Sequence, residues 1–117
     1  MCDDYEPAIW NWKPITQGGT YPATNVLETL SASNLSQVVV TIEARGTDVA
    51  SLTLDSGATG ITINVATAGA WDYTINTISA ATTAGLVVGF YDVTHKVTDS
   101  AGVVTFVSKG TWQILAK

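Results

Sequence analysis

The stretch TISAATTAGLVVGFYDVTHKVTDSAGVVTFVSKGTWQILA, residues 77–116, decides the fold. Within it, residues 91–97 alternate, with Tyr, Val, His and Val on one face and Asp, Thr and Lys on the other. This period of two is typical of a strand that buries one face. Residues 99–102, Asp-Ser-Ala-Gly, then predict a turn, because Asp can bond its own backbone and Gly tolerates a positive φ. We therefore expect a hairpin whose second strand covers residues 103–107.

Two further elements adjoin this hairpin. Residues 111–115 follow Lys109 and Gly110 and predict a third strand, which would make a three-stranded meander. Residues 79–85 predict one short helical turn, since Ser79 can cap its N-terminus and Gly85 can end it.

The earlier sequence predicts short strands separated by turns every eight to twelve residues or so. The predicted strands are residues 25–30, 37–45, 51–54, 61–65 and 71–75. The predicted core includes Val38, Val40 and Ile42, and also the inward aromatic residues Trp71, Tyr73, Tyr91 and Trp112. The pattern predicts an all-β protein, an antiparallel immunoglobulin-like β-sandwich of about seven or eight short strands. A small β-barrel is the alternative.

Composition narrows the classes of function. A chain of 117 residues favours one domain, here a sandwich over residues 16–117 preceded by an N-terminal arm over residues 1–15. The net charge is −5 and the five cationic residues are scattered, so we expect no nucleic-acid partner. A lone Cys2 and a lone His95 can form neither an intrachain disulfide nor a structural zinc site. Without a long apolar run or a secretory signal, we expect no membrane partner and synthesis in a reducing cytoplasm.

The first 13 residues differ from the rest, because acidic and aromatic side chains crowd together there. Two alternatives follow for this segment. It could pack back as a first edge strand, with both tryptophans at the rim of the core. It could instead be an assembly arm that anchors a neighbouring subunit through exposed aromatic rings. The second alternative gives the candidate partner-binding residues Tyr5, Trp10, Trp12 and Tyr21.

The search for reactive groups finds no catalytic constellation. The acidic candidates are expected to be solvated carboxylates on strand faces or in turns; they are Glu43, Asp72, Asp92 and Asp99. His95 lies on the inward phase, so we expect a core histidine whose nitrogens bond backbone groups. Asp55, Ser56 and Thr59 place oxygens in one loop but lack a calcium-binding spacing. We therefore expect no enzyme, no metal, no cofactor and no role for Cys2, and infer a binding or structural protein.

Residues 78–114 resemble a motif of tailed-bacteriophage structural proteins, in which a Thr/Ala-rich turn leads to Leu, Gly-x-Tyr, an alternating strand and Thr-Asp-x-x-Gly. The matching residues are Thr83, Leu86, Gly89, Tyr91, Val97, Thr98, Asp99, Gly102 and Gly110. The resemblance covers roughly residues 16–117, and the module is similar to the N-terminal β-sandwich of phage baseplate upper proteins. His95 departs from the pattern, where an apolar residue is usual, and so does the acidic, Trp-rich arm.

The resemblance implies a virion protein without catalytic activity, made in the cytoplasm of a bacterial host. We expect a structural or accessory role in capsid decoration, neck, tail or baseplate, with protein partners and a homo-oligomeric state. The alternative is a module that recognises host-surface glycan through Trp10, Trp12 or Tyr21, since aromatic faces bind sugar rings.

Overall fold

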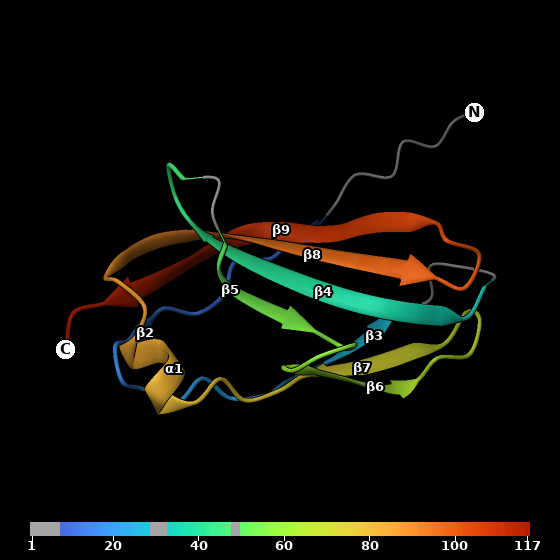
Figure 1. The fold of residues 1–117 in the computed structure, drawn as a ribbon, viewed down its shortest axis with the longest axis horizontal. Coiled ribbons are helices and arrows are strands. Elements are labelled where there is room, and N and C mark those ends of the chain that lie inside the picture. The colour runs from blue at the N-terminus through green and yellow to red at the C-terminus, as the bar shows by residue number, and fades with distance from the viewer. Residues whose placement is uncertain (1–7, 29–32, 48–49) are drawn as a thin grey trace.

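The computed structural model describes residues 8–28, 33–47 and 50–117, and it consists of two β-sheets that face each other across one core (Figure 1). The elements are β1 (Ala8–Ile9), β2 (Ile15–Thr16), β3 (Thr24–Glu28), β4 (Leu35–Ala44), β5 (Ala50–Asp55), β6 (Ile61–Val65), β7 (Trp71–Ile75), α1 (Ala80–Ala84), β8 (Gly89–Asp99) and β9 (Val104–Leu115). The predicted all-β class is confirmed.

The larger sheet has the order β1-β9-β8-β4-β5, and β2 also pairs with β9 farther along the same edge. The smaller sheet has the order β3-β7-β6. The ladders among β3 to β9 are antiparallel, as expected. The expectation of a purely antiparallel protein is wrong at one edge, because β1 and β2 run parallel to β9.

The predicted three-stranded meander is wrong, because β8 and β9 form one long hairpin. Gly110 does not interrupt β9 but lies in register with Val93. The pairing shifts between His95 and Lys96 of β8, which leaves one extra residue in β9. This β-bulge turns the successive residues Val107 and Ser108 both towards the core. The alternation of core-facing and outward residues therefore shifts by one position within β9. As a result, the sequence pattern of β9 resembles that of two separate strands.

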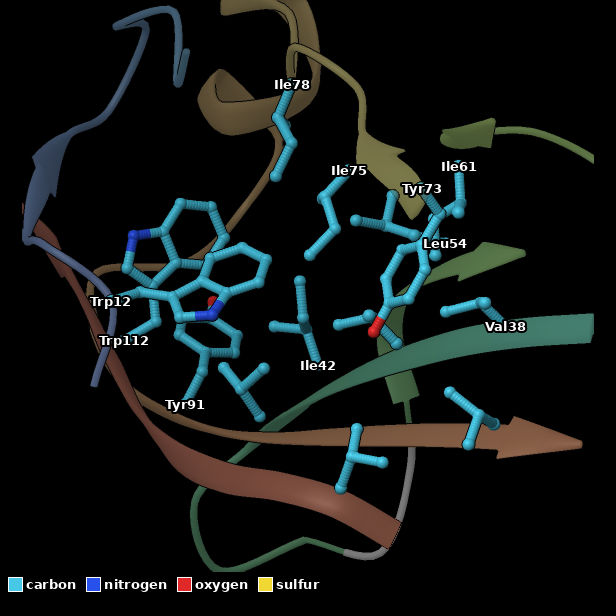
Figure 2. Packing of buried hydrophobic residues seen from close by; sticks show 14 of the residues in the cluster. Trp12, Val38, Ile42, Leu54, Ile61, Tyr73, Ile75, Ile78, Tyr91 and Trp112 are labelled. Atoms are coloured by element: carbon cyan, nitrogen blue, oxygen red, sulfur yellow. The ribbon is translucent and has the colours of Figure 1, made fainter. Parts of the chain in front are cut away.

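The core contains the residues that the alternation predicted. Val38, Val40 and Ile42 of β4 are fully buried. The four aromatic residues expected inside are also buried; they are Trp71, Tyr73, Tyr91 and Trp112. Figure 2 shows several of them, among them Ile42, Tyr73 and Trp112, meeting between the two sheets. Burial of one large apolar side chain contributes roughly 1.5–3 kcal/mol, so this shared core is the main source of stability.

The predicted helical turn is confirmed as α1. The Ser79 hydroxyl accepts a hydrogen bond from the Thr82 N–H at 3.2 Å and caps the helix. Gly85 forms the C-cap. The buried Thr83 hydroxyl donates to the carbonyl of Gly19 at 2.6 Å, which attaches α1 to the turn after β2. This bond places the turn and the N-terminal segment beside the body of the protein.

Candidate functional site

The described part of the predicted arm lies along the free edge of β9, and we call residues 8–16 the N-terminal strand. The Trp10 N–H donates to the Lys109 carbonyl at 3.0 Å, and the Trp12 N–H donates to the Thr111 carbonyl at 2.9 Å. Trp12 is only 6% exposed. Of the two alternatives that the sequence left open, residues 8–13 therefore follow the edge-strand alternative.

Gly110 makes this docking possible. A Cβ atom at Gly110 would overlap the carbonyl oxygen of Trp10 and lie 2.5 Å from its carbonyl carbon. The Asn11 side chain fills the adjacent space, where its Oδ1 accepts from the Thr111 N–H at 3.1 Å. A glycine inside a strand often marks the close approach of another backbone. Sequence reasoning noticed Gly110 but interpreted it as a break between strands.

Four rings form what we call the aromatic cluster: Trp10, Trp12, Tyr21 and Trp112. Trp12 stacks on Tyr21, with centroids 5.4 Å apart and an interplanar angle of 12°. The Trp112 ring lies 5.2 Å from both of these rings, and Trp10 lies 6.1 Å from Trp12. Each such pair contributes about 0.5–1.5 kcal/mol beyond its burial. Figure 2 shows Trp12 beside Trp112. The cluster thus fastens the N-terminal strand to β9.

Two hydrogen bonds complete the attachment, and both use the backbone of Lys13. The Trp112 indole N–H donates to the Lys13 carbonyl at 3.0 Å. The Lys13 N–H donates to the Tyr21 hydroxyl at 3.1 Å. Burial raises the pKa of Tyr21, and the Lys13 bond opposes that rise. Sequence reasoning placed Trp112 in the core but missed that it bonds the N-terminal strand.

A cleft of about 470 Å³ lies beside the aromatic cluster. Its lining combines aromatic, proline and polar side chains: Trp10, Asn11, Trp12, Lys13, Pro14, Ile15, Tyr21, Pro22 and Thr24. Trp10 and Tyr21 are half-buried, whereas Trp12 gives the cleft little accessible surface. The structure therefore brings together three of the four predicted site residues. Tyr5 and Cys2 lie outside the described residues. The cleft can hold the apolar face of a ligand between polar side chains, so its shape and lining are suited to binding.

His95 is buried, as predicted, but its partner differs from the expectation. Its Nε2 lies 2.6 Å from the Tyr73 hydroxyl, so a side chain and not a backbone group bonds it. Burial lowers the pKa of His95 to about 4. The Trp10 ring covers it at 5.9 Å. A general base must reach its substrate. The neutral imidazole of His95 is enclosed by the core, so it has the properties of a buried polar group of the fold.

The four candidate carboxylates have different surroundings and do not form one site. Asp72 accepts from Asn25 and Asn64, at 2.7 and 3.2 Å, on the outer face of the smaller sheet. Asp92 pairs with Arg45 at 3.3 Å on the outer face of the larger sheet, next to Glu43 on β4.

Asp99 differs from the expectation of a solvated turn residue, because it is only 7% exposed. Its Oδ1 accepts from the N–H groups of Ala101 and Val103, both at 2.9 Å. This carboxylate therefore holds the β8–β9 turn in place by accepting two of its backbone N–H groups.

The oxygens of the loop after β5 are committed to the fold. Asp55 Oδ1 accepts from Gln37 at 2.9 Å and from the Gly57 N–H at 2.8 Å, and these bonds lower the pKa of Asp55. Ser56 accepts from the Val38 N–H at 2.9 Å. Within residues 8–28, 33–47 and 50–117, no three His, Cys, Asp or Glu side chains gather to hold a metal ion.

No family model matches the chain, and no curated protein is significantly similar to it. In the part of the chain that the structure describes, no helix has the length and apolar character needed to span a membrane.

Proposed function

We propose that the chain is a non-enzymatic structural or accessory protein of a tailed-phage virion. It assembles there by protein–protein contacts, in capsid decoration, neck, tail or baseplate. The observation that carries this proposal is the role of the residues that resemble the phage motif. Most of these residues have a task within the fold, in the core, a turn or a close backbone contact, as we expect of an assembly module.

Three positions of the motif illustrate these tasks. Gly89 and Gly102 have φ values of 145° and 85°, which residues other than glycine rarely adopt. The Tyr91 hydroxyl donates to the carbonyl of Val87, two residues before β8 begins. Asp99 holds the turn, and Gly110 allows the N-terminal strand to approach β9. The residues of the motif therefore serve the folding of the β8–β9 hairpin. This supports a scaffold whose surface contacts determine its role.

We also infer that the sandwich is immunoglobulin-like. In that fold, one sheet has the strands A, B, E and D and the other has G, F and C, with C′ added in variable-type domains. The orders β3-β7-β6 and β9-β8-β4-β5 correspond to B-E-D and G-F-C-C′. The Tyr91 bond to the backbone four residues upstream corresponds to the tyrosine corner near strand F.

The test of the virion role is mass spectrometry of purified virions made from the genome that encodes this chain. The proposal expects the protein in many copies per particle, at a constant ratio to the other structural proteins after density-gradient purification. Recovery of the protein only from the soluble fraction of the lysate would overturn it.

A second candidate function is glycan recognition at the 470 Å³ cleft, favoured by the partly exposed Trp10 with Asn11 and Lys13 also in the lining. One observation speaks against this function. Trp12 and Tyr21 stack on each other, so each covers a ring face that a sugar would need. A glycan array with wild type and Trp10→Ala tests it, with Phe90→Ala as a control on a different surface. Binding that is lost only in Trp10→Ala supports recognition, and no binding by wild type excludes it.

A further inference from the structure

The cleft beside the aromatic cluster contains hydrogen-bond donors that the fold does not use. In the described part of the chain, the indole N–H groups of Trp10 and Trp12 have no hydrogen-bond partner, although both residues line the cleft. The indole N–H of Trp71, by contrast, donates to the Ser33 carbonyl at 3.1 Å. Among the described residues, no buried polar side-chain atom lacks a partner, so the two free indole N–H groups reach solvent.

Two further residues of the lining add free donors. The Tyr21 hydroxyl oxygen accepts from the Lys13 N–H at 3.1 Å, and its own O–H has no acceptor among the described residues. The Asn11 Oδ1 is engaged by the Thr111 N–H at 3.1 Å, while the Asn11 NH₂ group has no acceptor in the same part of the chain. None of the described residues that line the cleft carries a carboxylate. The cleft therefore has an excess of donors over acceptors.

This excess favours a ligand that accepts hydrogen bonds without donating them. Proline has a C=O group but no N–H, so a proline-rich segment presents acceptors only. A sugar hydroxyl donates as well as accepts, and the Asn11 oxygen in this lining is already engaged. An anion also accepts only, but a chain of net charge −5 with a single lysine in this lining attracts anions weakly.

The walls of the cleft fit the same ligand. Pro14, Ile15 and Pro22 line it together with the partly exposed Trp10 and Tyr21. Proline-rich segments in the polyproline II conformation dock into aromatic-lined grooves of this kind, and they lose little entropy because the conformation forms in advance. The volume of about 470 Å³ lies within the range of about 300–1,000 Å³ that is usual for ligand sites.

We propose that this cleft binds a proline-rich segment of a protein partner in the polyproline II conformation. Trp10, Trp12 and Tyr21 donate hydrogen bonds to the carbonyl groups of the segment, and the proline rings of the segment pack against the apolar walls. The inference deepens the proposed function, because it names the chemistry of the protein partner, and it rests on that function for the expectation that such a partner exists.

The first test follows the indole N–H signals of the wild-type chain by NMR while decaproline is added to millimolar concentration. The signals of Trp10 and Trp12 should shift along one saturable curve. The Trp71 signal is the internal control and should stay in place, because its N–H is already bonded to Ser33. A glycine–serine decapeptide, which lacks the polyproline II conformation, should shift none of the three signals.

A substitution tests the hydrogen bond separately from the ring. Trp10→Phe keeps an aromatic ring but removes the donor, so decaproline should bind about twofold to tenfold more weakly. Phe90→Ala, on a different surface, is the matched control and should bind like wild type. Circular dichroism establishes that both variants fold. Wild-type affinity in Trp10→Phe would overturn the proposed role of the Trp10 indole.

Three results with wild type would overturn the inference. One is the absence of a saturable shift with decaproline, and another is an equal shift with the glycine–serine peptide. The third is a shift of the Trp10 and Trp12 signals with cellohexaose or decaglutamate but not with decaproline, which would assign the cleft to a glycan or to an acidic segment. Each measurement uses the isolated chain, so its failure would leave the virion role to the mass spectrometry above.

Discussion

The two sides of the sandwich present opposite solutions to the problem of an open sheet edge. On one side, the chain covers β9 with its own N-terminal strand and fixes that strand with the aromatic cluster. On the other, β5 ends the sheet, and its residues 50–54 carry no charge. An edge that is closed internally contributes to stability, while an open edge remains available for a partner. The first side therefore stabilises the fold, whereas the second contributes no such closure.

The largest loss of stability is expected from a substitution on the closed side, where the N-terminal strand covers β9. Trp12→Ala removes a buried ring that contacts Trp10, Tyr21 and Trp112, so it should lower the free energy of unfolding by about 3–5 kcal/mol. Urea denaturation measures this. The control is Phe90→Ala, a ring that is 49% exposed on the outer face, where we expect a loss below about 1 kcal/mol. Equal losses in the two variants would contradict the closed-side account.

Low pH should destabilise the same side of the fold, because the buried His95 would have to take up a proton there. Its pKa is about 4 in the fold against 6.5 for the free side chain, so the unfolded chain binds the proton more readily. The stability is complete above pH 6.5 and is lost as the pH falls towards 4, by roughly 3 kcal/mol in total. Denaturation curves at several pH values should show this loss, and His95→Gln should flatten it between pH 6.5 and 4.

The N-terminal strand contributes to this enclosure, because the Trp10 ring covers His95 at 5.9 Å. Trp10→Ala should therefore raise the pKa of His95 towards its ordinary value, as followed by NMR titration of the imidazole. An unchanged pKa would show that the rest of the core encloses His95 without help from this strand.

Gly110→Ala tests the close approach of the two backbones. The added Cβ would overlap the Trp10 carbonyl, so the N-terminal strand must move away from β9 at a cost of about 1–3 kcal/mol. Gly57→Ala is a suitable control, because its Cβ would have no neighbour closer than 3.4 Å and its φ is not positive. Slow amide exchange of Trp12 in wild type should become fast in Gly110→Ala and remain slow in the control.

The smallest effect sharpens the comparison from the open side. Thr53 is exposed and its side chain supports no part of the core, so Thr53→Lys should change the free energy of unfolding by less than about 0.5 kcal/mol. Denaturation at a concentration where the protein is monomeric measures it. A large loss would mean that the β5 edge belongs to the folding unit.

The sequence predicted the parts of the fold that depend on local pattern. Alternation located β4, β7 and β8, and capping residues located α1, because these signals lie within a few neighbouring residues. The continuity of β9 was missed because its bulge reverses the phase at Val107 and Ser108. A bulge depends on the pairing with β8, which the period of a single strand does not report.

Three of the four candidate partner-binding residues lie together, and their role stays a prediction. Trp10, Trp12 and Tyr21 do lie together, yet Trp12 packs inside the protein. An alternating Trp-x-Trp pattern shows that two rings share a face, and it does not show whether that face meets the chain's own core or a partner. Gly110 was the available signal, since it lies opposite Trp10, but only the fold pairs the two ends of the chain.

The most direct test of the division between the two sides is the urea denaturation of a chain that begins at Pro14, beside the full chain. The account predicts that removing Trp10 and Trp12 with their β9 pairing lowers the free energy of unfolding by at least about 3 kcal/mol, or prevents folding. A truncated chain with an unchanged midpoint would contradict it, because the N-terminal segment would then be dispensable to the fold and free to act as an arm.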